Sequence, residues 1–139
     1  MLIPDFSKYS LALFEGNVLI YSSQDKGLRP LFDSLEKYKE KSGLILHDKV
    51  IGLAAARLIV YSKIISGVVT TVASLPAKKF LEDNDINIIA DEVTANILTK
   101  DRNSICPGEV IALNTEAPDD FSRKIKAMLN GNVNISQIN

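Results

Sequence analysis

Cys106 is the only cysteine of the chain, and its sequence neighbours predict that it begins a helix. Pro107 follows it, and proline is favoured at the first helical position, where an N–H would have no helical partner. Glu109 would then occupy the third helical position, where its carboxylate can reach back to the backbone N–H of the cap. A thiol at the cap lies beside the positive end of the helix, which lowers its pKa and makes it more nucleophilic. The pattern therefore predicts Cys106 as a catalytic thiol, and the alternative is a small buried hydrophobic residue.

A second set of candidate residues, His47, Asp48 and Lys49, precedes the longest apolar stretch of the chain. Asp48 is a favoured helix cap, so we expect it to begin a helix that runs from Lys49 to about residue 63. As a catalytic residue, Asp48 would orient or deprotonate the ligand. His47 could bind the ligand, carry a proton or coordinate zinc, and the alternative is an ordinary turn residue. One histidine and one cysteine are too few for a zinc site unless carboxylates or water complete it, so no metal is predicted.

Arg29 lies in the run Gly27-Leu28-Arg29-Pro30, just before another predicted helix. Its guanidinium suits a carboxylate or a phosphate, so with Lys49 it would bind the anionic group of a small-molecule ligand. A solvated side chain is the alternative for each. Glu109 is expected mainly as a capping-box residue at the ligand site, with acid–base catalysis as the lesser alternative. The sequence has no Gly-rich phosphate loop, Ser–His–Asp set or dinucleotide fingerprint, and no cofactor is predicted.

The hydrophobic pattern predicts alternating strands and helices around these residues. Two β-rich runs flank a Gly-Asn pair and predict a hairpin. Strand–helix–strand units in the second half indicate an α/β protein with a parallel or mixed sheet and helices on both of its faces. The segment 91–103 has no clear pattern, and a short helix followed by a polar loop at 99–103 is one interpretation of it. The expected strands are 11–14, 18–21, 44–46, 67–73 and 86–90, and the expected helices are 30–41, 49–63, 77–83, 107–114 and 118–129.

Length and composition favour one compact domain over residues 1–139, with its core at about 8–129 and a frayed tail at 131–139. The net charge of −1 gives no support for nucleic-acid binding. One cysteine cannot form an internal disulfide, which favours a reducing, cytoplasmic location. The chain starts without the features of a signal peptide, and its longest apolar stretch is too short to span a bilayer, so no membrane partner is expected. A homodimer is the commonest assembly on general grounds.

Three segments together are similar to a known family: 26–31 (KGLRPL), 48–56 (DKVIGLAAA) and 106–109 (CPGE). In this order, behind a hairpin, they resemble a small family of uncharacterised prokaryotic proteins with a cytidine-deaminase-like fold. The resemblance covers about residues 8–129. It implies a three-layer α/β/α sandwich with a mixed sheet of about five strands.

Deaminases of this fold carry His-or-Cys-Ala-Glu at one helix start and Pro-Cys-x-x-Cys at the next, which hold zinc, with the Glu as acid and base. The matching positions here, 47–49 and 76–80, contain neither that Glu nor a cysteine. The resemblance therefore implies a metal-free relative with a small-molecule or nucleotide-like ligand site around Asp48 and a reactive Cys106 for thiol-based transfer. The alternatives are a non-catalytic ligand-binding module and a divergent deaminase-type hydrolase whose metal ligands are His47, Asp48 and Cys106.

Overall fold

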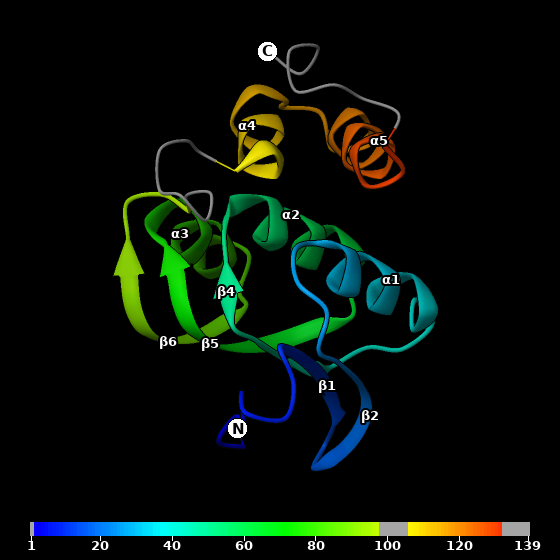
Figure 1. The fold of residues 1–139 in the computed structure, drawn as a ribbon, viewed down its shortest axis with the longest axis vertical. Coiled ribbons are helices and arrows are strands. Elements are labelled where there is room, and N and C mark those ends of the chain that lie inside the picture. Colours follow the sequence, from blue (N-terminus) through cyan, green and yellow to red (C-terminus); the bar gives the residue numbers. More distant parts are fainter. Residues whose placement is uncertain (1, 98–105, 132–139) are drawn as a thin grey trace.

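The computed structural model describes residues 2–97 and 106–131, and these form a mixed six-stranded sheet with five helices (Figure 1). The predicted α/β class is confirmed. Most of the expected elements are present, although several have different limits. The strands are β1 (Leu11–Glu15), β2 (Val18–Ser23), β3 (Leu44–Asp48), β4 (Val50–Ile51), β5 (Ile65–Ser74) and β6 (Asn87–Thr94).

The central strand of the sheet is β5, which has β3 and β4 along one edge and β6 along the other. Val72 and Ala73 pair with β4 and also with β6, and Val68 pairs with both β3 and β6, so β3 and β4 must share an edge. These pairs are all parallel, whereas β1 is antiparallel to both β2 and β3. The strands β3 and β4 therefore follow one line that is interrupted at Lys49, which explains why six strands are found where about five were expected.

The helix that follows β4 begins later than the sequence predicts. Asp48 ends β3, and Val50 and Ile51 pair with β5, so the expectation that Asp48 caps this helix is wrong. The cap is Gly52, which has an extended backbone. Two β-branched residues in register with a buried strand favour the sheet over one more helical turn. The helices are α1 (Arg29–Lys37), α2 (Leu53–Ser62), α3 (Leu75–Asp83), α4 (Pro107–Asn114) and α5 (Pro118–Leu129).

The described helices lie on one face of the sheet, so the expected three-layer α/β/α sandwich, with helices on both faces, is not found among the described residues. The helices α1, α2 and α3 lie side by side against the sheet, and α4 and α5 form a second layer outside α2 (Figure 1). The connections β2–α1–β3, β4–α2–β5 and β5–α3–β6 all advance in the same direction across the sheet. Right-handed crossovers that advance in one direction place their helices on the same face.

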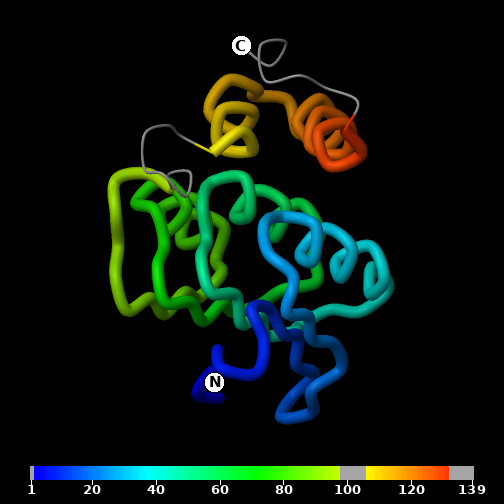
Figure 2. The backbone as a smooth tube through the Cα atoms, viewed as in Figure 1, coloured from blue at the N-terminus to red at the C-terminus, as the bar shows by residue number. Residues whose placement is uncertain are grey.

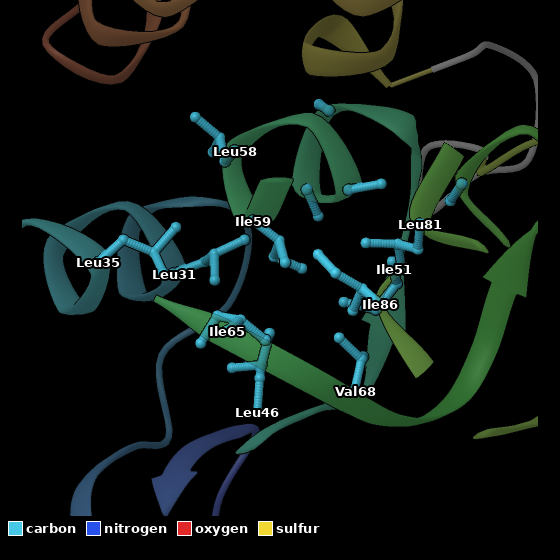
Figure 3. Close-up of a cluster of buried hydrophobic side chains, with 14 of the residues drawn as sticks. Leu31, Leu35, Leu46, Ile51, Leu58, Ile59, Ile65, Val68, Leu81 and Ile86 are labelled. Atoms are coloured by element: carbon cyan, nitrogen blue, oxygen red, sulfur yellow. The ribbon is translucent and has the colours of Figure 1, made fainter. Parts of the chain in front are cut away.

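The main hydrophobic core lies between the sheet and this first layer of helices (Figure 3). Leu46 and Val68 of the sheet face Ile59 of α2, and each of the three is almost fully buried. Because α2 is apolar nearly all round, it needs cover on both sides, which the sheet and α4 supply. The sequence predicted such a covered, central helix.

Three sequence expectations concern segments at the edge of the described residues. The strand β6 runs to Thr94, which places part of the segment without a pattern in an edge strand. The polar loop expected at 99–103 and the frayed tail expected at 132–139 lie outside the described residues. No helix among the described residues is long and apolar enough to cross a membrane.

Candidate functional site

A pocket of about 720 Å³ opens where β3 and β4 end and α2 begins. Segments that are far apart in the sequence line it: 6–11, 24–28, 48–50 and 106–109. The carboxyl ends of parallel strands are where open α/β sheets usually bind ligands. Single residues that complete the lining are Pro30, Gly52, Ala55, Ile97 and Met128.

Four of the six site residues expected from the sequence line this pocket. They are Asp48, Lys49, Cys106 and Glu109. The two residues predicted as catalytic, Asp48 and Cys106, therefore reach one cavity although 58 positions separate them in the sequence. His47 and Arg29 do not line it, and each makes its contacts elsewhere.

Among the acidic residues that line the pocket, Asp48 has the most strongly shifted pKa. Burial raises the pKa of its carboxyl from an ordinary 3.8 to about 8, because a buried carboxyl disfavours its charged form. The backbone N–H groups of Val50 and Lys49 oppose this shift and lower the pKa by less. A carboxyl with this pKa is largely protonated near neutral pH, so it can donate a hydrogen bond and exchange a proton with a bound molecule.

Glu109 caps a different helix from the one that contains it. Its carboxylate accepts hydrogen bonds from the N–H of Leu53 at 2.8 Å and of Ala54 at 2.7 Å, which are the first two residues of α2. The capping-box role expected within its own helix is therefore wrong. The residue is 7% exposed, and burial raises the pKa of its carboxyl while the two N–H groups lower it. Figure 2 shows the first turns of α4, in yellow, and α2, in green, close together.

Glycine allows this close approach of the two helices. A Cβ on Gly52 would lie 2.5 Å from Oε1 of Glu109, closer than carbon and oxygen atoms can pack. A Cβ on Gly108 would lie 2.7 Å from a methyl group of Leu28. Protein side chains therefore fill the space beside Gly108. The sequence did contain a signal for this contact, because Gly52 directly precedes an apolar helix. That signal does not identify Glu109 as the residue that packs against the glycine.

Cys106 is the N-cap residue of α4, as the sequence predicts. The expected lowering of its pKa is wrong. Burial raises the pKa of the thiol, and the negative charge of Glu109 raises it further. The helix dipole favours a thiolate, but partial burial and a carboxylate three residues away outweigh it. Cys106 is therefore placed to contact a ligand but is not activated as a nucleophile by its surroundings.

Arg29 and His47 stabilise the fold away from the pocket. The guanidinium of Arg29 donates to the backbone carbonyl of Leu129 and forms an ion pair with Asp33 at 3.7 Å, so it connects α1 to the end of α5. His47 is fully buried, and its Nδ1 is hydrogen-bonded to the hydroxyl of Tyr9 at 2.8 Å. Burial lowers the pKa of His47, which keeps the imidazole neutral.

Two lysines that were not predicted as site residues, Lys8 and Lys26, line the pocket beside Lys49. Exposed lysines are common on all proteins, and nothing in the local sequence distinguishes Lys8. Lys26 begins one of the three segments that carry the family resemblance, which was the available signal for it. Within the described residues, no group of three or more His, Cys, Asp or Glu side chains is arranged to hold a metal ion.

Comparison with known proteins identifies the family. The chain belongs to the family described as Domain of unknown function (DUF1893), whose model matches residues 5–129. It is similar to the crystal structure of a DUF1893 family protein from Thermotoga maritima, with a TM-score of 0.78 and 28% identity over 88% of this chain and 82% of that chain. No curated protein matches the chain. The expectation of an uncharacterised family is confirmed at this level.

Proposed function

We propose that this DUF1893 family protein binds a small organic molecule in the pocket at the start of α2 and exchanges a proton with it through Asp48. One observation carries the proposal: a partly buried aspartate whose carboxyl has its pKa raised to about 8 lies in a cavity of about 720 Å³ at the carboxyl ends of parallel strands. An acid with a strongly shifted pKa in a cavity of this size is a candidate functional site.

The lining supports a nucleotide-like ligand, with a flat, partly apolar body and polar edges. Phe6, Tyr9, Leu28 and Met128 offer apolar surface to such a body. Asp48 would hydrogen-bond its polar edge, as a donor when protonated and as an acceptor when ionised. Arg29 has no part in this proposal, because its guanidinium is held by α5 and Asp33.

We also infer a relationship to the cytidine-deaminase fold, as the sequence resemblance implies. The mixed sheet supports it, since α2 connects the parallel neighbours β4 and β5 and α3 connects the parallel neighbours β5 and β6. The starts of two such helices hold zinc in deaminases. Here the first residues of α2, Leu53 to Ala55, and of α3, Leu75 to Ala77, include no metal-binding side chain. The metal-dependent alternative has less support, because His47 is bonded to Tyr9 and does not line the pocket with Asp48 and Cys106.

Cys106 is proposed as a ligand-contacting residue rather than as the main reacting group. Its place in the pocket supports contact with the ligand, whereas its raised pKa gives less support to thiol-based transfer. A cytoplasmic location stays part of the proposal, because a reducing compartment would keep this single cysteine in the reduced thiol form. The remaining alternative, a binding module without catalysis, uses the same pocket and differs only in the absence of turnover.

The test is a thermal-shift and NMR screen of nucleosides, nucleotides and related heterocycles against the wild type, Asp48→Ala and the matched control Asp91→Ala. Asp91 is exposed on the edge strand β6. We expect ligands that stabilise the wild type and Asp91→Ala but bind Asp48→Ala more weakly. Equal binding to all three proteins, or no ligand in the pocket, would contradict the proposal. Product analysis with each hit then separates an enzyme from a binding module.

A further inference from the structure

Three lysines lie at the pocket, each from a different segment of the chain. Lys8 belongs to the N-terminal segment, Lys26 to the connection between β2 and α1, and Lys49 to the junction of β3 and β4. All three are exposed, whereas Glu109 on the same pocket is buried. The lysines therefore belong to the solvent-exposed part of the lining, the mouth of the pocket, rather than to its interior.

Hydrogen bonds hold these three segments together. The amide side chain of Gln24 donates to the carbonyl of Lys8 at 3.1 Å, and the N–H of Lys49 donates to the carbonyl of Ser10 at 3.1 Å. The hydroxyl of Ser10 contacts the carbonyls of Ser23, at 3.0 Å, and of Asp25. Ser10 thus connects the segments that carry Lys26 and Lys49. The hydrogen bonds of the fold therefore hold the three lysine-bearing segments next to one another.

The positive charge at the pocket mouth is only partly compensated. Among the described residues, Lys26 and Lys49 form no ion pair, and Lys8 has a long exposed pair with Asp5 at 3.7 Å. Of the acids on the pocket, Glu109 is bonded to the start of α2 and Asp48 is largely protonated near neutral pH. Asp25 is the remaining carboxylate against three ammonium groups, in a chain whose net charge is −1.

We propose that Lys8, Lys26 and Lys49 form a phosphate-binding subsite at the mouth of the pocket, so that the ligand is a phosphate monoester of a small organic molecule. This inference rests on the proposed function and adds the chemical class of its ligand. A phosphate monoester carries up to two negative charges and three acceptor oxygens, which three separate ammonium groups can bind from different sides. The organic part would extend inward, toward the apolar lining and Asp48.

The probe is phenyl phosphate, titrated by NMR and calorimetry, with inorganic phosphate and benzyl alcohol as partial probes. The test variant replaces the three subsite residues (Lys8→Gln, Lys26→Gln, Lys49→Gln). The matched control makes the same change of net charge at exposed lysines outside the pocket (Lys39→Gln, Lys63→Gln, Lys126→Gln). A third protein with arginine at the subsite positions keeps the charge and tests whether binding follows it.

We expect phenyl phosphate to bind the wild type, the control and the arginine variant, and to bind the subsite variant about tenfold or more weakly. Binding should weaken as salt is added. Phenyl phosphate should also bind more tightly than benzyl alcohol. An equal loss in the control variant, an unchanged affinity in the subsite variant, or no binding at millimolar concentrations would overturn the subsite.

The same titrations separate this subsite from the proposed function. If nucleosides bind in an Asp48-dependent manner but their phosphates bind no more tightly, the subsite fails and the proposed function stands. If phenyl phosphate binding depends on the three lysines while no organic ligand depends on Asp48, the subsite stands and the proposed function fails. If inorganic phosphate binds as tightly as phenyl phosphate, the site takes free phosphate and the monoester assignment is overturned.

Discussion

The proposed chemistry depends on Asp48, because its carboxyl gains or loses a proton near pH 8, close to the pH at which most proteins work. A raised carboxyl pKa means that the folded protein holds this proton more tightly than the unfolded chain does. The stability that results is fully present below the ordinary pKa of 3.8 and is lost as the pH rises to about 8. The carboxyl therefore makes the fold less stable as it ionises.

We expect Asp48→Asn to remove this loss of stability. The amide resembles the protonated carboxyl and cannot ionise. The variant and the wild type should have similar unfolding free energies near pH 4. At about pH 8 the variant should be more stable by about 1–3 kcal/mol, an amount reduced from the full shift because part of the residue is exposed. Urea unfolding at several pH values measures this, with Asp91→Asn as the control. A constant difference across that range would contradict the raised pKa.

Cys106 gives a second prediction at the scale of one residue. Because its pKa is raised, its thiolate should be scarce at neutral pH and should increase only in alkaline solution. The rate of alkylation by iodoacetamide should therefore rise steeply between about pH 7 and 10. No other thiol is present to confuse the measurement. Similar rates at pH 6 and at pH 8.5 would show an activated thiol and would favour thiol-based transfer as the function of the pocket.

Glu109 and Gly52 control how two helices meet, which is a property of elements rather than of single residues. The N-cap residue of α2 is Gly52, which has no side chain to accept a hydrogen bond. Glu109 of α4 supplies the missing acceptor. The carboxylate also interacts favourably with the positive end of that helix. This contact positions the start of α4, and with it Cys106, on the pocket.

The two residues should therefore be energetically coupled. Gly52→Ala would push a methyl group against the carboxylate and should cost about 2 kcal/mol of stability. Glu109→Ala should cost about 2 kcal/mol, because two buried N–H groups lose a charged acceptor. The double variant should lose less than the sum, by about 1 kcal/mol or more. Chemical denaturation of the four proteins measures the coupling.

A matched control for this cycle pairs Gly52→Ala with Glu116→Ala, since Glu116 is an exposed glutamate in the connection after α4. The losses of stability caused by these two changes should be additive. Simple additivity of Gly52→Ala and Glu109→Ala would mean that the cap contact does not join the two helices as described.

In the whole molecule, two layers of helices are stacked on one face of the sheet, and the outer layer needs its own attachment. Besides the contacts of Glu109 and Arg29 described above, Arg57 of α2 attaches this layer, and it is 5% exposed. Its guanidinium donates to the carbonyl oxygens of Ala112 at 2.9 Å and of Glu116 at 3.0 Å, and lies 4.2 Å from the centre of the Phe121 ring. A planar group with several donors can make these contacts together, and an ammonium cannot.

Arg57→Lys should consequently destabilise the protein by about 3 kcal/mol. Amide exchange should increase most in residues 106–131, because the outer layer loses its main polar attachment. Arg123→Lys is the control, because Arg123 is exposed on α5 and pairs only with Asp120. Faster exchange spread evenly over the sheet would argue against a specific role in holding the outer layer.

The opposite face of the sheet has no helix over it among the described residues. Ile89 is 53% exposed there, although its neighbours Ile88 and Ala90 pack against the core on the other side. The homodimer expected from general frequencies remains a proposal, and this face is one surface that a dimer would bury. Sedimentation at several concentrations would test it.

Local signals in the sequence determined the elements whose ends depend on nearby residues. Proline after a cap residue predicted the start of α4 at Pro107, and an amphipathic run predicted α5 with its observed limits. Alternation of strand and helix patterns predicted the α/β class. Asp48, Lys49, Cys106 and Glu109 were selected from the sequence by residue type and position, and the fold brings all four to one pocket.

Only the tertiary structure decided which distant residues meet. Val50 and Ile51 joined the sheet because β5 lies beside them, and this moved the start of α2 to Leu53. Glu109 found its partners 55 and 56 positions away, and the three lysines were brought together by hydrogen bonds between separate segments. Propensity and capping act over a few neighbouring residues, whereas pairing, burial and the pKa of a carboxyl depend on atoms that the folded chain brings from elsewhere.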